Sequence, residues 1–452
     1  MAIEATVPQP HINLQRGWPS PHLLPAKALL AGADGVLSNT ARATDVMLYG
    51  PNIGDPALRK DIAEWLSRLY CLRSPQAQIQ KLRSRSQLPR SALLSGFTDP
   101  VYARRIWMVE PTYFLACTIF EDAGFQGRLT GVPEGDDGVD VEFLRARIND
   151  VDEEAAKSGA DAQETTFKNS PQYPKLYRHV ITSFPRSAIQ ARKHTHSRGE
   201  RLWLNWLGSG FTGHSKSASM PPPPPPRLID VDNSLPGGDL KWGNAVSNGS
   251  FSKVLGPGMR CGWAEATPDF ITRLNLVLQV NSRRPLIEHV LRTGNMEDHI
   301  RQVLVPTYKA RCAIVQQAIE EYLGPLGGNI DIGRPYNLPA GNETEQVMGG
   351  FINITFPEGI AADDVAAVSL KDYNLRFLAS GAMRVRGSSG MSNEALLSRG
   401  ARLCWAWEEE YMLIEDLSHS SYSLVRLQPQ ENITFLQNRL LLKQRILIPG
   451  YQ

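Results

Sequence analysis

Hydrophobic residues in the first quarter of the chain recur first with a helical period and then with the density of a buried strand. Segment 49–70 begins with a Gly/Pro loop and then places five large apolar residues on one helical face: Leu58, Ile62, Trp65, Leu66 and Leu69. Residues 106–109 form a short apolar run, a Glu-Pro turn follows, and residues 113–123 return to a helical pattern. Strand, loop and helix in this order predict an α/β domain.

The C-terminal part of the chain has a different pattern, mainly helical from about residue 286. We predict one long helix over 306–323 and strands over 349–357 and 400–407. An amphipathic stretch then ends the recognisable fold near residue 418. Residues 419–452 are an unassigned extension.

Two stretches interrupt the α/β pattern. Residues 72–92 and 186–226 are rich in Arg and Ser, and the second ends in a hexaproline run. Both are predicted to be irregular and poorly ordered, because they have too few apolar groups to offset the entropy of ordering. The polyproline run itself is typical of a stiff spacer.

The most informative polar segment is 247–265, SNGSFSKVLGPGMRCGWAE. Lys253 follows a hydroxyl-bearing run and precedes Arg260 by seven residues. This pattern suits a Schiff base to pyridoxal phosphate (PLP), because the amine is a covalent handle. Ser250, Ser252 and Arg260 have the chemistry to hold a phosphate dianion.

Two other interpretations of this segment are weaker. A lone lysine is usually a solvated surface charge. Gly256-Pro257-Gly258 begins like a dinucleotide-binding loop, but Gly262 falls one residue late, and no acidic residue follows at the expected distance within a clear strand.

Composition narrows the class of protein. The chain of 452 residues is 42% hydrophobic and 21% charged, with a formal net charge of +2, which is ordinary for a globular protein and unlike a nucleic-acid binder. The five cysteines are scattered and never form a C-x-x-C pair, so we expect reduced thiols and no zinc site. The N-terminus lacks the pattern of a secretory signal, and no stretch has the length of a membrane span. We expect a cytosolic protein.

The lysine segment resembles the cofactor-lysine motif of fold-type-I PLP enzymes, Ser-x-Ser-Lys followed by Pro-Gly-x-Arg-x-Gly, at every position. The chain as a whole resembles the class I/II aminotransferases, most closely the fungal branch related to 2-aminoadipate and aromatic amino acid aminotransferases. The resemblance runs with gaps from about residue 12 to 418. It implies an α/β fold of the type-I PLP-dependent transferase kind: a large domain with a mixed, mostly parallel sheet and a smaller α+β domain.

The resemblance also implies roles for single residues. Lys253 is the catalytic and cofactor-binding lysine, and Ser250, Ser252 and Arg260 hold the phosphate. Tyr113, in VEPTY, stacks on the pyridine ring, and Tyr49 reaches the cofactor phosphate of the neighbouring subunit. Arg402 takes the α-carboxylate of the substrate, a role that suits a planar fork of N–H donors, and the backbone at Gly17 meets the same carboxylate.

Three parts of the family pattern are missing. RSRSQLPRSALL stands where the glycine-rich phosphate loop belongs. Residues 186–190 stand in place of the Asn-Pro-x-Gly turn, whose asparagine bonds the phenolic oxygen of the cofactor. No Asp-x-x-Tyr strand precedes the polyproline run, so the acid that protonates the pyridine nitrogen is absent. Misassigned splicing or reading frame in these segments and a divergent relative that binds PLP poorly both explain the pattern.

We therefore expect an aminotransferase that moves an amino group between an α-amino acid and a 2-oxo acid, in amino-acid or secondary metabolism. The alternatives are a PLP-dependent lyase on the same fold and a catalytically impaired relative. The expected division is an N-terminal arm (1–45) that is part of the small domain, a large domain (46–285), a small domain (286–418) and the extension (419–452). The role of Tyr49 implies a homodimer.

Overall fold

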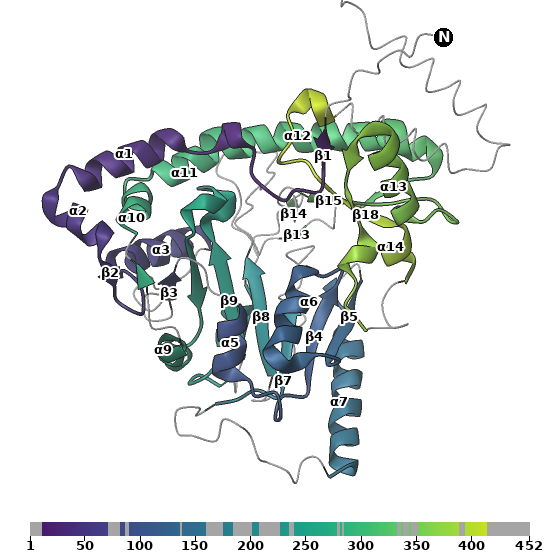
Figure 1. The fold of residues 1–452 in the computed structure, drawn as a ribbon, viewed down its shortest axis with the longest axis horizontal. Helices are drawn as coiled ribbons and strands as arrows, with labels where there is room; N and C mark the ends of the chain where they lie inside the picture. The colour runs from purple at the N-terminus through teal and green to yellow at the C-terminus, as the bar shows by residue number, and fades with distance from the viewer. Residues whose placement is uncertain are drawn as a thin grey trace, which may run out of the picture.

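The central feature of the chain is an eight-stranded sheet, seen in a computed structural model (Figure 1). This structure describes residues 11–70, 82–85, 90–135, 138–159, 175–183, 201–207, 227–234, 239–277, 281–282, 284–331, 336–337, 343–344, 351–387 and 394–413. The remaining residues, including the predicted extension 419–452, lie outside this description.

The sheet has the order β3-β10-β9-β8-β7-β4-β5-β6. Its strands are β3 (Leu82–Arg85), β10 (Gly262–Glu265), β9 (Ala245–Ser250), β8 (Arg201–Leu207), β7 (His179–Ser183), β4 (Arg105–Glu110), β5 (Leu129–Gly135) and β6 (Gly138–Val139). The five strands from β9 to β5 are parallel, while β10 is antiparallel to both β9 and β3, and β6 is antiparallel to β5. The sheet is mixed and mostly parallel, as predicted.

Both faces of this sheet are buried, and β4 shows why. Ile106 and Met108 pack with α5 (Arg90–Phe97), α6 (Leu115–Phe120) and α9 (Pro268–Val277). Trp107 and Val109, which point to the other face, pack with α7 (Val141–Lys157) and α8 (Leu228–Ser234). A strand covered on both faces needs a continuous apolar run, which is what residues 106–109 provide.

A second, smaller sheet lies in the C-terminal part of the chain. It is antiparallel, in the order β12 (Asn329–Asp331), β15 (Phe351–Thr355), β18 (Gly400–Cys404) and β17 (Leu378–Ala379). The helices α13 (Ala362–Tyr373) and α14 (Glu394–Arg399) contact it. Strands over 349–357 and 400–407 were predicted, and β15 and β18 confirm both with shorter bounds.

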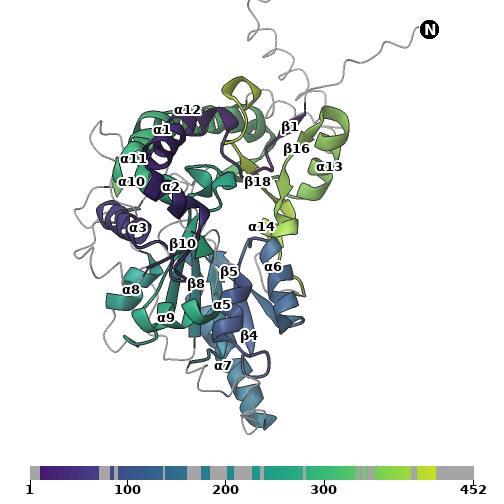
Figure 2. The ribbon, with the colours of Figure 1, turned by 60° about the vertical axis from the view of Figure 1, so that its left-hand side comes forward.

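A long helical segment crosses one end of the molecule. It comprises α11 (Asn295–His299), the π-helical turn η7 (Ile300–Leu304), α12 (Val305–Ala318) and a second π-helical turn, η8 (Ile319–Leu323). The helix predicted over 306–323 is therefore confirmed and begins earlier. In both views α12 spans the end of the molecule opposite α7, and α1 (Ala26–Leu37) runs beside it (Figures 1 and 2).

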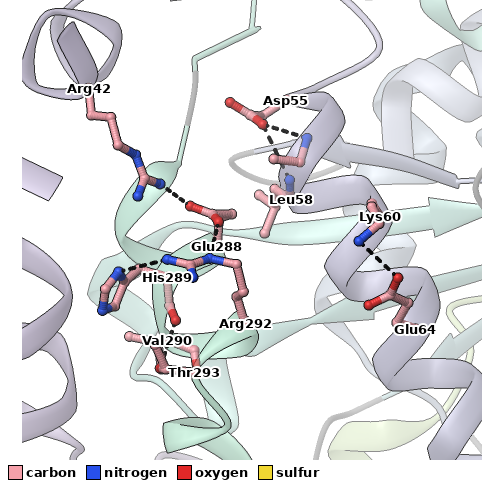
Figure 3. Close-up of polar contacts among 11 residues, drawn as sticks. Arg42, Asp55, Leu58, Lys60, Glu64, Glu288, His289, Val290, Arg292 and Thr293 are labelled. Carbon is pink, nitrogen blue, oxygen red and sulfur yellow. Dashed lines mark hydrogen bonds and ion pairs between the residues drawn. The ribbon is translucent and has the colours of Figure 1, made fainter. Parts of the chain in front are cut away.

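The helix predicted in segment 49–70 is α3 (Pro56–Leu69). The Asp55 side chain caps it by accepting hydrogen bonds from the backbone N–H groups of Ala57 at 2.9 Å and Leu58 at 3.3 Å (Figure 3). Four of the five apolar residues on the predicted face are buried, and Leu69 is partly buried against the same core. The helix packs on α10 (Pro285–Arg292), which in turn packs on α1.

Short pairings complete the description. They are β1 (Ile12–Asn13) with β16 (Leu375–Arg376), β2 (Tyr49–Gly50) with β11 (Asn281–Ser282), and β13 (Tyr336–Asn337) with β14 (Glu343–Thr344). The helix α2 (Thr40–Met47) leads into β2, and 3-10 turns lie at η1 (Pro21–Leu23), η5 (Phe251–Lys253), η6 (Pro257–Met259), η9 (Gly324–Leu326) and η10 (Ser380–Met383). In the described part of the chain, no helix is long and apolar enough to cross a membrane.

The prediction that 72–92 and 186–226 are irregular is wrong for part of each stretch. Residues 82–85 form the edge strand β3, and residues 201–207 form β8, a central strand between β7 and β9. The reason is that β8, Arg-Leu-Trp-Leu-Asn-Trp-Leu, is itself an apolar run suited to a strand with neighbours on both sides. The polar average composition of residues 186–226 concealed the strand pattern of residues 201–207. The other residues of both stretches, apart from 90–92, which begin α5, lie outside the described part of the chain.

Candidate active site

The lysine segment lies where β9 ends, at the carboxyl edge of the parallel strands, the usual place for a ligand site in such sheets. Ser250 ends β9 and caps η5: its Oγ accepts a hydrogen bond from the backbone N–H of Ser252 at 3.1 Å. The hydroxyl groups of Ser250 and Ser252 also lie 2.9 Å apart. Both predicted phosphate-binding serines are thus beside Lys253.

Lys253 is largely buried, and its Nζ donates a hydrogen bond to the backbone carbonyl of Gly17. Burial lowers the pKa of Lys253, the positive charge of Arg402 lowers it further, and the Cys404 thiol opposes the shift. A lysine amine with a lowered pKa is a better nucleophile and proton carrier near neutral pH. The structure therefore brings three of the predicted site residues, Lys253, Gly17 and Arg402, into one neighbourhood.

Arg402 comes from β18 of the smaller sheet, where it pairs with Asn353 of β15 and Leu378 of β17. Burial lowers the pKa of its guanidinium. Its Nε is buried without a hydrogen-bond partner, and among the described residues it has no acidic partner. A largely buried cation without a counterion is costly, so this position suits an anionic ligand.

The N-terminal arm is tied to the segment that follows β18. The backbone N–H of Cys404 donates to the carbonyl of Leu14 at 2.6 Å, and the Glu408 carboxylate accepts from the N–H of Asn13 at 2.8 Å. These contacts hold the arm over the smaller sheet, so that Gly17 reaches Lys253. The predicted position of the Gly17 backbone at the site is consistent with this geometry.

Tyr113 follows the carboxyl end of β4 after a cis Glu110–Pro111 peptide bond. The loop is fixed to η10 and the residues after it, because the N–H of Thr112 donates to the Met383 carbonyl at 2.8 Å and the Glu110 carboxylate accepts from the N–H of Val385. The Tyr113 side chain is 37% exposed and lies close enough to Arg402 to oppose, in part, the lowering of the guanidinium pKa by burial.

Two predicted cofactor ligands are not joined to this group by any described contact. Arg260 is exposed in the left-handed region at φ 48°, and its guanidinium donates to the Pro257 carbonyl at 3.4 Å. Tyr49 is 84% exposed on β2. Both stay predictions for this protein.

Sequence reasoning missed Phe351, the first residue of β15. The guanidinium carbon of Arg402 lies 4.2 Å from the centroid of its ring. The only available signal was strand alternation, since residues 351 and 353 share one face of the predicted strand. No sequence motif distinguishes this phenylalanine from a core residue.

The structure describes the three segments that depart from the family pattern to different extents. Of the segment 83–94, which stands in place of the phosphate loop, residues 83–85 lie in β3, residues 90–94 lie in α5, and residues 86–89 lie outside the described part of the chain. Residues 186–190, which stand in place of the asparagine turn, also lie outside it. The place of the acid-bearing strand is different: β8 precedes the polyproline run and contains neither Asp nor Tyr.

Comparisons with known proteins agree on the class. No family model matches the chain. It is 26% identical over 410 residues to an uncharacterised protein of Saccharomyces cerevisiae, covering 80% of this chain and 86% of the relative. It is 25% identical over 371 residues to aromatic-amino-acid aminotransferase 1 of Thermococcus litoralis, covering 77% and 74%. The solved structure of Pyrococcus horikoshii kynurenine aminotransferase in complex with PMP aligns with a TM-score of 0.66, at 19% identity, over 93% of this chain and 92% of that one.

The sheet order and these alignments give the chain the fold of the type-I PLP-dependent transferases. Among proteins of this fold, the chain is similar to the class I/II PLP-dependent aminotransferases, as the sequence predicted. None of these relatives supports the alternative of a lyase.

The described residues suit the attachment of PLP and the binding of its phosphate and of the substrate carboxylate. Lys253 and Arg402 are largely buried cations, and among the described residues neither forms an ion pair with a carboxylate. A phosphate dianion and a substrate carboxylate would neutralise such a site. Lys253 would attach the cofactor, and Ser250 and Ser252 lie beside it for the phosphate. Arg402 lies near Lys253 and would hold the substrate carboxylate.

Proposed function

We propose that this chain is a PLP-dependent aminotransferase that moves an amino group from an α-amino acid to a 2-oxo acid. The observation that carries the proposal is the placement of two partly buried basic side chains, Lys253 at the carboxyl edge of the type-I PLP sheet and Arg402 near it from the smaller sheet. Bound PLP supplies the electron sink for this chemistry. The protein has to attach it, orient it and move a proton beside it.

Each step of that work has a residue in the described site. The neutral amine of Lys253, favoured by burial, takes and returns a proton at its Nζ. Arg402 orients the substrate by bonding its carboxylate through two N–H donors. The arm covers the site and limits the access of water to Lys253, since the Gly17 carbonyl contacts its amine.

Replacing Lys253 tests this function. Lys253→Ala, reconstituted with PLP, should lose the visible absorption band of the bound cofactor and form no 2-oxo acid from any amino donor. Lys241→Ala is the control, because Lys241 is an exposed lysine in the turn before β9. A Lys253→Ala protein that keeps both the absorption and the amino-donor-dependent activity would contradict the proposal.

One observation favours a second candidate, a catalytically impaired relative. Strand β8 occupies the centre of the sheet without an acidic residue. Each lost polar partner of a buried ligand costs about 1–3 kcal/mol, so the three missing parts together would weaken PLP binding by a few orders of magnitude if their effects added. Titration of the apoprotein with PLP, followed by absorbance, separates the candidates: an impaired relative binds only at millimolar PLP, and a competent enzyme binds well below that.

We also propose a homodimer in which Tyr49 reaches the site of the partner subunit. Exposed large apolar residues in one region of the chain support this: Leu30, Leu37, Met47, Leu48 and Tyr49. A segment with many exposed large apolar residues is typical of an interaction surface.

We also propose the division into an arm (1–45), a large domain (46–285) and a small domain (286–418), and the two separate sheets support it.

The proposal extends to the substrate, an aromatic amino acid, and to a cytosolic location. The name of the Thermococcus relative supports an aromatic amino acid, and 2-aminoadipate and lysine-related substrates remain alternatives, in amino-acid or secondary metabolism. A cytosolic location is supported by the four described cysteines, Cys117, Cys261, Cys312 and Cys404, which are all free thiols.

A further inference from the structure

A single phenylalanine lies between the arginine and the arm of the candidate site. Phe351 pairs directly with Cys404 across β15 and β18, and Asn353 pairs with Arg402. Directly opposed residues share a face of the sheet, so Phe351 and Arg402 are diagonal neighbours on the same face. The guanidinium carbon of Arg402 lies 4.2 Å from the centroid of the Phe351 ring, well within the range of a cation–π contact.

Nothing else in the described structure fixes the guanidinium of Arg402. Its Nε is buried without an acceptor, and among the described residues no hydrogen bond or ion pair holds the group. Arg311, by contrast, is oriented by the Glu409 carboxylate and the Ala406 carbonyl. For Arg402, the ring of Phe351 takes that place.

The same ring limits the space at the arm. An ideal Cβ atom on Gly17 would lie 2.4 Å from Cζ of Phe351 and 3.1 Å from Cε1. The ring therefore packs directly on the backbone of Gly17, whose carbonyl accepts the hydrogen bond from Lys253. A side chain at position 17 would push the ring, and the ring would move the guanidinium.

We propose that Phe351 is a positioning residue: it holds Arg402 ready for a substrate carboxylate, and it requires glycine at position 17. A guanidinium over a ring face keeps its N–H donors for two parallel bonds to a carboxylate, whereas a carboxylate partner in the protein would compete with the ligand. This inference rests on the proposed role of Arg402 in carboxylate binding.

The test measures binding of a carboxylate that cannot react. The PLP-loaded full chain is titrated calorimetrically with 3-phenylpropionate, and with 3-phenylpropionamide to show the contribution of the charge. Phe351→Leu should bind the carboxylate about 5- to 30-fold more weakly, the range of a partly desolvated cation–π contact, with PLP affinity unchanged. Phe356→Leu is the matched control, because Phe356 is a buried phenylalanine just after the same strand. It packs near Phe377, and the described cation–π contact of Arg402 is with Phe351 and not with it. This substitution should lower thermal stability and leave carboxylate binding unchanged.

A second comparison isolates the ring itself. Gly17→Ala should weaken carboxylate binding in the wild-type background and have a smaller effect beside Phe351→Leu, because the smaller side chain no longer fills the space. Equal effects in both backgrounds would overturn the inference, as would wild-type affinity in Phe351→Leu. If Phe351→Leu does not fold, the same binding measurements are made with Phe351→Met.

The outcomes for the two proposals are distinguishable. A protein that binds the carboxylate through Phe351 and Arg402 but transaminates no amino donor contradicts the proposed function and supports this inference. A protein that transaminates while Phe351→Leu binds the carboxylate normally, with KM unchanged, contradicts this inference alone. A wild-type protein that does not bind the carboxylate overturns this inference, and it overturns the proposed function as well if it transaminates no amino donor.

Discussion

Asp61, on α3, is a buried carboxyl beside other carboxyl groups. Its side chain packs near α10, where Glu288 forms ion pairs with Arg42 and Arg292 (Figure 3). Burial raises the pKa of Asp61 to about 6, and the negative charges of Glu288 and Glu64 add to the shift. A carboxyl group with a higher pKa in the folded chain favours folding in its neutral form. Its contribution to stability is present below about pH 4 and is lost as the pH rises through 6.

Asp61→Asn should therefore stabilise the protein in a pH-dependent way. At pH 8 the substitution removes a buried charge, and we expect the free energy of unfolding to rise by about 1–3 kcal/mol. At pH 3 Asp61 is largely protonated in both the folded and the unfolded chain, so the two proteins should be nearly equally stable. Urea denaturation at both values of pH measures this, with Glu142→Gln, an exposed carboxylate on α7, as the control. An equal gain at both values would show that charge is not the cause.

Three glycines of the lysine segment, Gly249, Gly258 and Gly262, differ in how much space surrounds them. A Cβ atom at Gly249 would lie 2.1 Å from the Trp263 ring, and one at Gly262 would lie 2.6 Å from the Gly249 carbonyl oxygen, whereas a Cβ at Gly258 meets nothing within 4 Å. The close approach of β9 and β10 explains the first two positions. The space at Gly258 does not explain the third.

Gly249→Ala should destabilise the protein and weaken PLP binding, because displacement of Trp263 or of β9 also moves Ser250 and Lys253. Overpacking of this kind costs about 1–3 kcal/mol. Gly258→Ala, from the same motif, should melt within about 0.5 kcal/mol of the wild-type protein. Thermal denaturation and PLP titration measure both effects, and a Gly258→Ala protein as unstable as Gly249→Ala would contradict the steric explanation.

At the scale of elements, the N-terminal arm depends on the segment after β18. Glu409 accepts hydrogen bonds from Arg311 at 2.6 Å and from the Ser20 hydroxyl at 3.1 Å. Arg311 is only 2% exposed and lies on α12, so this carboxylate connects three elements: the arm, the long helix and the end of the smaller sheet.

Glu409→Ala should release the arm. It leaves the buried guanidinium of Arg311 without its charged partner, and we expect a loss of about 1–3 kcal/mol, since Glu409 itself is partly exposed to solvent. Trypsin should then cleave after Arg16 faster than in the wild-type protein. Glu410→Ala, at the exposed neighbouring position, is the control. Unchanged cleavage after Arg16 would show that other contacts hold the arm.

At the scale of the whole molecule, the exposed apolar residues at 47–49 predict the surface of the dimer. Met47 is 76% exposed and Leu48 is 57% exposed. Met47→Glu should shift the sedimentation coefficient towards that of a monomer and weaken PLP binding, because Tyr49 would no longer reach the partner's site. Leu240→Glu, a substitution at a position 74% exposed elsewhere, should change neither. A Met47→Glu protein that stays a dimer would place the interface on another surface.

The helix α3, the strand β4 and the lysine segment were predictable from the sequence because their signals are local. Side-chain periods of 3.6 and 2 follow from backbone geometry, and the spacing of Lys253, Arg260 and the glycines lies within one short segment. The resemblance to known aminotransferases supplied Arg402 and Gly17 as matched positions. Strand β8 was missed because the average composition of residues 186–226 outweighed seven apolar-rich residues.

Only the tertiary structure decided which distant residues share one environment. Phe351, Gly17, Arg402 and Lys253 come from four separate segments of the chain, and no sequence period connects them. Their contacts arise because β15 and β18 pair in one register, which places the ring beside the guanidinium, and because the arm is tied down over both. The lowered pKa of Lys253 has the same origin, since desolvation and the charge of Arg402 depend on packing in three dimensions.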